Sequence, residues 1–204
     1  MLDTMVDLRS EEENQRKLCS NSRKNHSAIP DRMGRRVIRN INEAYRFFEG
    51  YGSSVLDVGC GDGLGIAHFK ELGMAQAYGI EFVQERVDTA RSFGLDVIKG
   101  MAEDLSAYGN RTVNIFCSHT LEHTLDFKKA IEEIKRVAYM LVWIIVPIEA
   151  NTKNGAHHSP IRSLSQIREH FPETDWIKIK EVYKSDLEPE GIIAFVRNIV
   201  ALPI

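Results

Sequence analysis

The stretch of residues 55–65, which reads VLDVGCGDGLG, constrains the fold of this chain more than any other part of the sequence. It begins with an apolar run as short as a buried strand. Asp57 interrupts that run, and a buried carboxylate is costly unless something binds it. Glycines then follow at alternate positions, where no side chain blocks the approach of a ligand to the backbone. A strand that ends in a glycine-rich turn before a helix is typical of a nucleotide-binding loop in an α/β sheet.

The spacing of these glycines distinguishes between kinds of nucleotide site. The dinucleotide fingerprint requires glycines at its first, third and sixth positions. Counted from Gly59 the sixth position is Leu64, and counted from Gly61 it is Ile66, so the fingerprint fails in both registers. The Gly-x-x-x-x-Gly-Lys-Ser/Thr pattern of a P-loop is also missing from the sequence. An NAD enzyme and a P-loop nucleotidase are therefore disfavoured.

The order of the other patterns predicts the sheet around this loop. Apolar positions at helical spacing indicate helices, and short apolar or alternating runs indicate strands. The expected helices span residues 33–48, 65–72, 84–93, 127–137 and 163–171, the last with Ser163 as N-cap. The expected strands span 53–58, 75–81, 96–99, 112–118, 140–147, 177–183 and 192–199. This order predicts an α/β fold with a mostly parallel sheet, helices on both faces and a C-terminal antiparallel hairpin at one edge.

Composition limits the size, partners and compartment of the protein. The chain has 204 residues, enough for one sizeable domain, and is 43% hydrophobic and 27% charged. Residues 1–32 are polar and charged, so we interpret them as a mobile arm before a single domain at 33–204. The net charge of −3 gives no overall attraction to nucleic acid or anionic membrane. With three scattered cysteines, no apolar run long enough for a membrane span and no secretory signal, we expect a cytoplasmic protein.

Residues 57–63, which read DVGCGDG, closely resemble the first motif of the class I S-adenosylmethionine-dependent methyltransferases. The resemblance implies the Rossmann-like three-layer sandwich of that family, with a seven-stranded sheet. It also implies S-adenosyl-L-methionine as cofactor and S-adenosyl-L-homocysteine as product. Asp57 would hold the cofactor's ammonium group, directly or through water, and Asp62 is either a further acceptor or a turn residue. Backbone N–H groups for the cofactor would come from Gly59, Cys60, Gly61 and Gly63.

Two later strand ends complete the expected cofactor pocket, because ligands bind at the carboxyl ends of parallel strands. Glu81 lies 20 residues past Gly61, and its carboxylate can accept both ribose hydroxyl protons. After the third strand, the resemblance implies contact with adenine, with Asp104 or alternatively Glu103 accepting from the adenine amino group. The residues expected at these two strand ends are Glu81, Phe82, Met101, Ala102, Glu103 and Asp104.

The segment after the fourth strand combines histidines with a carboxylate. Its Leu-Glu-His sequence at 121–123 resembles a segment of small-molecule methyltransferases of the ubiquinone-biosynthesis type. In those enzymes the segment borders both cofactor and acceptor, which adds Ser118 and His119 to the expected cofactor contacts. The candidates for a general base are His119, His123 and His158, because an imidazole titrates near neutrality. His157 is an alternative to His158.

The same segment also matches a metal-binding pattern. His119-x-x-Glu122-His123 fits the His-x-x-Glu-His sequence of certain zinc peptidases. That chemistry requires these residues on one helix with a distant third ligand. Here the pattern begins directly after a strand, so we expect no metal.

The function expected from this resemblance is methyl transfer to a small-molecule acceptor by in-line displacement. One alternative is a nucleic-acid or protein methyltransferase whose basic positions at 16–39 hold phosphates. Another is a module that binds the cofactor without turnover. Arg35, Arg36 and Arg39 either line the pocket and favour an acidic acceptor, or form a solvated face. We expect a monomer or homodimer with no membrane partner.

Overall fold

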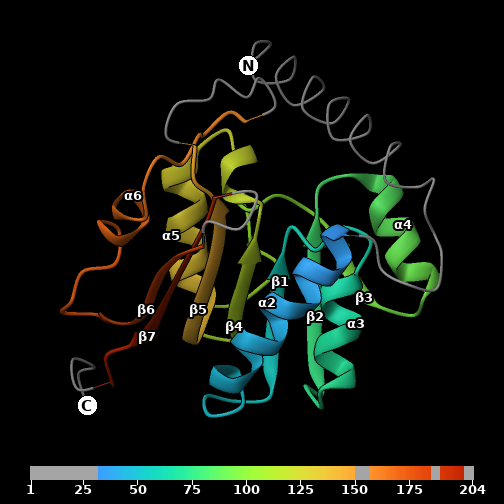
Figure 1. Ribbon diagram of the computed structural model, residues 1–204. Coiled ribbons are helices and arrows are strands. Elements are labelled where there is room, and N and C mark those ends of the chain that lie inside the picture. The colour runs from blue at the N-terminus through green and yellow to red at the C-terminus, as the bar shows by residue number, and fades with distance from the viewer. Residues whose placement is uncertain (1–31, 150–156, 185–188, 200–204) are drawn as a thin grey trace.

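The computed structural model describes residues 32–149, 157–184 and 189–199. In these residues seven strands form one sheet in the order β3-β2-β1-β4-β5-β7-β6 (Figure 1). Strands β1 to β5 pair in parallel, and β6 and β7 form an antiparallel hairpin whose inner strand, β7, pairs with β5. The strands are β1 (Ser54–Val58), β2 (Gln76–Glu81), β3 (Asp96–Lys99), β4 (Val113–Ser118), β5 (Ala138–Pro147), β6 (Trp176–Lys184) and β7 (Glu190–Arg197).

The strand order reverses between β1 and β4, which lie side by side although β2 and β3 separate them in the sequence. Val58 and Cys117 are register partners at the ends of these two strands. The loops that follow β1 and β4 therefore begin next to each other. A reversal of this kind opens a crevice at the carboxyl ends of the strands, where open α/β sheets bind ligands.

Helices cover both faces of the sheet and give three layers (Figure 1). On one face, α2, α3 and α4 pack through residues such as Ile41, Phe69 and Val87, and on the other α5 packs through Ile134. Each large apolar side chain buried in this way contributes roughly 1.5–3 kcal/mol. The helices are α2 (Arg32–Phe48), α3 (Leu64–Glu71), α4 (Gln84–Ser92), α5 (Phe127–Val137) and α6 (Ser165–Arg168), with a 3₁₀ turn η2 (Leu121–His123) after β4.

The structure confirms the predicted architecture. One element differs, because the helix predicted at 163–171 is shortened to α6. Its N-cap position is Leu164 rather than Ser163, since the Ser163 hydroxyl pairs with that of Ser165 at 2.5 Å. At the other end, the N–H groups of residues 170 and 171 bond to carbonyls three residues earlier, so the chain tightens before Pro172.

The prediction of an arm at 1–32 falls outside the described residues except for Arg32, where α2 begins. Within the described ranges, none of the helices combines the length and apolar character needed to cross a membrane.

Candidate functional site

The loop between β1 and α3 has a backbone that requires glycine. Gly59, Gly61 and Gly63 have φ angles of 77°, 57° and 87°, a region that favours glycine because other residues carry a Cβ. A Cβ on Gly59 would also overlap the Thr120 side chain, and one on Gly63 would overlap Leu95. Thr120 closes onto the loop through its Oγ1, which donates to the Val58 carbonyl at 2.9 Å. The loops after β1 and β4 are thus locked together.

The carboxylate of Glu81 ties this loop to the end of β2. Its Oε2 accepts the Gly61 N–H at 2.9 Å, and its Oε1 accepts the Val83 N–H at 2.8 Å. Each carboxylate oxygen has a second lone pair for another donor. Glu81 is therefore held in one orientation by the backbone and can still accept hydrogen bonds from a ligand.

Asp57 lies below the loop at the start of α3. Its carboxylate is buried, and a Cβ on Gly65 would overlap it. Burial, together with the neighbouring Glu81 carboxylate, raises the pKa of Asp57 to about 7. Because Asp57 lies near the end of β1 and Glu81 at the end of the neighbouring strand β2, their carboxylates make this region attractive to a cation.

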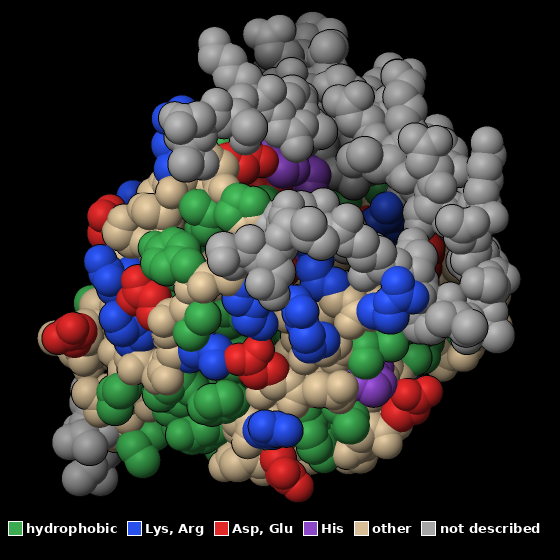
Figure 2. All heavy atoms as spheres, in the orientation of Figure 1, with side chains coloured by type: hydrophobic (Ala, Val, Ile, Leu, Met, Phe, Trp, Pro, Cys, Tyr) green, Lys and Arg blue, Asp and Glu red, His purple; other side chains and the backbone are tan. Residues whose placement is uncertain are grey.

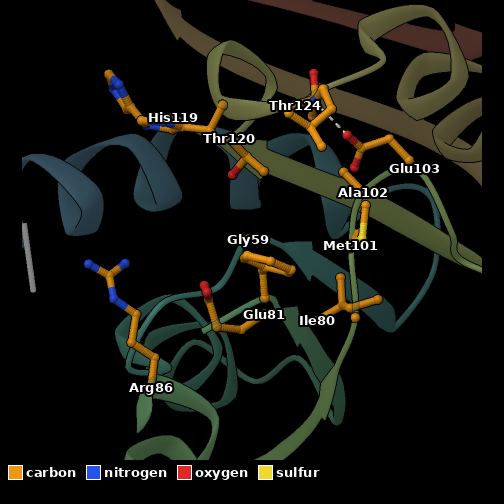
Figure 3. Close-up of a pocket in the computed structure, with 14 residues that line it drawn as sticks. Gly59, Ile80, Glu81, Arg86, Met101, Ala102, Glu103, His119, Thr120 and Thr124 are labelled. Carbon is orange, nitrogen blue, oxygen red and sulfur yellow. Dashed lines mark hydrogen bonds between the residues drawn. The ribbon is translucent and has the colours of Figure 1, made fainter. Parts of the chain in front are cut away.

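A pocket lies over the carboxyl ends of the strands, where open α/β sheets bind their ligands. Figure 3 shows Glu81 and Arg86 on one side of it and His119 and Thr120 on the other. The lining residues are Gly59, Ile80, Glu81, Phe82, Arg86, Gly100, Met101, Ala102, Glu103, His119, Thr120, His123, Thr124 and Leu125.

Half of the predicted cofactor contacts line this pocket. They are Gly59, Glu81, Phe82, Met101, Ala102, Glu103 and His119. The others are absent from its lining: Asp57, Cys60, Gly61, Asp62, Gly63, Asp104 and Ser118. The pocket is also lined by residues that the sequence motifs do not predict, although they follow strand ends: Arg86, Thr120, Thr124 and Leu125.

Of the two carboxylates weighed for adenine, the structure brings Glu103 to the pocket. Glu103 is buried, and its Oε1 accepts the N–H of Leu125 at 2.8 Å. Asp104 is exposed, and its Oδ1 accepts the N–H of Ser106 at 3.1 Å. Hydrogen bonds from Ser106 hold the pKa of Asp104 below its usual range. The carboxylate of Asp104 therefore stabilises the local turn in which Asp104 lies.

His119 joins the pocket to a group of buried carboxylates. Its φ is 53°, its Nε2 lies 2.7 Å from Glu190 Oε1, and its Nδ1 lies 3.5 Å from Glu122 Oε1. Burial lowers the pKa of His119, but hydrogen bonds to Glu122 and Glu190 outweigh it and raise the pKa above its ordinary value. Glu190 also accepts from Asn40 Nδ2 at 3.2 Å.

The other candidate bases separate in the structure. His123 lines the pocket, and its ring lies edge-on to that of His157 with centroids 4.8 Å apart. His157 hydrogen-bonds Glu149 through Nδ1. His158 is exposed and is not among the lining residues, so His157 rather than His158 faces the site.

The zinc-peptidase pattern and the arginines also have clear positions. Glu122 and His123 lie on η2, and His119 precedes that turn, so these residues do not share one helix. Arg35 and Arg39 are exposed on α2. Arg36 Nε lies 3.7 Å from Glu190 Oε1, which makes it the arginine of the three that faces the site.

Comparison with known proteins agrees with this architecture. A family model described as "Methyltransferase domain" matches residues 56–140. Magnesium protoporphyrin IX methyltransferase from Synechocystis PCC 6803, solved with bound SAH, is 15% identical, with a TM-score of 0.71 over 96% of this chain and 100% of that one. A SAM-dependent methyltransferase from Aquifex aeolicus is 20% identical, with a TM-score of 0.57 over 78% and 98% of the two chains.

The fold is also that of a protein with a different named reaction. The [4+2]-cyclase SpnF is 15% identical, with a TM-score of 0.65 over 79% of this chain and 82% of that one. No curated protein sequence matches the chain. The chain therefore matches a methyltransferase domain over residues 56–140, and it shares its seven-stranded fold with solved S-adenosylmethionine-dependent methyltransferases.

Proposed function

We propose that this protein transfers the methyl group of S-adenosylmethionine to a small-molecule acceptor. The observation that carries the proposal is Glu81, fixed at the pocket by the N–H groups of Gly61 and Val83. A carboxylate held at the second strand end suits the two vicinal hydroxyls of a ribose. The glycine-rich loop beside it suits close approach of the rest of the cofactor to the backbone.

The other lining residues suit the remaining parts of the cofactor. Phe82, Met101 and Ala102 offer apolar surface for adenine, and the buried Glu103 carboxylate beside them suits its amino group. Asp57 and Glu81 together make the region below the loop favourable for the cofactor's ammonium group. Relatives solved with SAH or SAM support the same cofactor here.

In this mechanism the bound cofactor supplies an electrophilic methyl group on its sulfonium. The chain aligns the acceptor with that group and excludes water, and such positioning supplies up to about 7–11 kcal/mol of the barrier reduction. His119, at the rim between pocket and carboxylates, takes the proton of a hydroxyl or amine acceptor. Glu190 orients the His119 imidazole through Nε2, which leaves Nδ1 on the side of Glu122.

The charge distribution on the surface favours a small-molecule acceptor over a polyanionic one. Figure 2 shows basic side chains interspersed with acidic ones over the face that carries α2. Lys184 and Lys180 both pair with Glu43 there. Paired charges of this kind contribute little attraction to phosphates. With a net charge of −3, we propose a cytoplasmic enzyme with a small acceptor.

Methyl transfer from labelled cofactor to fractions of a cell extract tests this proposal. We expect label in the small-molecule fraction, and Glu103→Gln to reduce it more than the matched Asp104→Asn, because Glu103 lines the pocket and Asp104 does not. Label found only in nucleic acid or protein would replace the proposed acceptor class. Cofactor binding without any label would favour a non-catalytic module.

A further inference from the structure

Three potential metal ligands meet beside the pocket. One ligand atom each from Glu122, His123 and His157 lies within 4.8 Å of the others. Two of these residues belong to η2, and His157 belongs to the segment beyond β5. His123 also lines the pocket, so the cluster opens toward that pocket.

The buried carboxylates around the cluster are short of partners. Glu122 is 1% exposed, and its Oε2 has no hydrogen-bond partner among the described residues. Glu149 is buried as well, and its Oε2 is also unsatisfied within that part of the chain. A buried carboxylate oxygen without a donor or cation costs several kcal/mol in general. These two oxygens therefore favour a positive charge between the side chains.

The residues that contact the three ligands hold them as the neighbours of metal ligands do. His157 uses Nδ1 to bind Glu149, which leaves Nε2 for a ligand, and carboxylates commonly orient metal-binding histidines in this way. Ser159 fixes the segment against η2, since its N–H donates to the Glu122 carbonyl at 3.0 Å and its Oγ to the Thr124 carbonyl at 2.8 Å. The three ligands are thus held by elements bonded to each other.

We propose that Glu122, His123 and His157 bind a divalent transition-metal ion such as Zn²⁺. Two imidazoles and one carboxylate are softer ligands than Mg²⁺ or Ca²⁺ prefer, and three protein ligands leave a position open. Metal–ligand bonds of about 2.0–2.2 Å place ligand atoms roughly 3–3.5 Å apart, so binding draws the side chains together by about an ångström. His119 is outside this set because it binds Glu190.

The catalytic role inferred for this metal site rests on the proposed methyl transfer and adds a class of acceptor to it. An acceptor hydroxyl at the open position becomes more acidic, as water does on Zn²⁺. The proton of the hydroxyl is released to solvent, and an oxygen lone pair forms the new C–O bond. The electrons of the broken S–CH₃ bond stay on sulfur, which becomes a neutral thioether. The acceptor class that fits is an alcohol, phenol or enol.

Metal binding is tested on the full chain after treatment with a chelator. Calorimetry with Zn²⁺, Co²⁺ and Mg²⁺, and the visible spectrum of bound Co²⁺, report stoichiometry and ligand type. We expect one Zn²⁺ or Co²⁺ per chain and much weaker binding of Mg²⁺. His157→Ala and Glu122→Gln each reduce Zn²⁺ affinity more than tenfold, and Glu149→Gln reduces it about 10–100-fold. His158→Ala, the exposed neighbour, changes it less than twofold.

Absence of stoichiometric Zn²⁺ and Co²⁺ binding overturns the site. Equal Zn²⁺ affinity in the wild type, His157→Ala and Glu122→Gln also overturns it. So does a loss of Zn²⁺ affinity in His158→Ala as large as that in the two ligand variants. S-adenosylhomocysteine binding, measured on the same samples, separates the two proposals. If it persists while metal binding fails, only the metal site is wrong, and if the wild type binds no S-adenosylhomocysteine, the proposed function fails first.

Discussion

Asp57 gives the most quantitative prediction, because its burial has an energetic consequence. The rise of its pKa from 3.8 to about 7 corresponds to a cost of about 4 kcal/mol for the ionised form in the folded protein. Below pH 3.8 the carboxyl is protonated in both folded and unfolded chains, so there is no penalty. The penalty grows as pH rises toward 7 and then stays constant, so this group makes the ligand-free protein less stable at higher pH.

Asp57→Asn removes that penalty. We expect the variant's free energy of unfolding, relative to wild type, to increase by about 2–3 kcal/mol between pH 5 and pH 8. Urea unfolding of the ligand-free proteins at several pH values measures this difference. Asp62→Asn, a half-buried carboxylate of the same loop, is the matched control and is expected to follow the wild type.

The same carboxylate links cofactor binding to proton release. Binding of an ammonium group favours ionised Asp57, so the affinity for S-adenosylhomocysteine is expected to rise from pH 5 to pH 7 in the wild type but not in Asp57→Asn. Calorimetry in two buffers with different ionisation heats counts the protons released. Parallel pH profiles of stability and affinity in the two proteins would refute the assigned role of Asp57.

Two further substitutions test other parts of the site. Gly59→Ala places a Cβ against Thr120 at a φ of 77°. We expect the free energy of unfolding to fall by more than the roughly 1–2 kcal/mol that a left-handed conformation costs. We also expect cofactor binding to be lost. Gly94→Ala is its control, because Gly94 has a φ of 73° but nothing within 4 Å of an added Cβ; thermal melts that fall equally would contradict the predicted overlap. Glu190→Gln removes a carboxylate that raises the pKa of His119. We therefore expect the variant to lose the folding stability that this pair contributes. That contribution is present at low pH and is lost as pH rises through the raised pKa of His119. The base-limited part of the activity profile should shift to lower pH, and an unchanged profile would exclude His119 as the base.

The sequence was sufficient to predict the parts of the site that follow from strand ends. Glu81 and the glycine-rich loop follow β2 and β1, and parallel strands bring their carboxyl ends together. The sequence was not sufficient to predict which of two adjacent side chains points into the pocket. Glu103 and Asp104 are adjacent in sequence, and the isolated bridge between Met101 and Asp104 belongs to a local turn that no periodicity reveals.

Contacts between distant segments were equally beyond sequence reasoning. Glu190 lies 71 residues after His119, and it reaches the pocket only because β7 inserts between β5 and β6. The pairing of Pro147 with Glu190 then fixes Glu190 at the carboxyl end of β5. The metal candidate has the same origin, since His157 approaches η2 through Ser159. Such juxtapositions depend on which strands pair and on how the loops pack, and the periodicity of a single sequence shows neither.

Calorimetric titration of the wild-type chain with S-adenosylmethionine and S-adenosylhomocysteine tests the central claim most directly. We predict one binding site per chain, and a reduction of at least tenfold in affinity for Glu81→Ala with little change for Asp104→Asn. No detectable binding of either compound by the folded wild type would contradict the account.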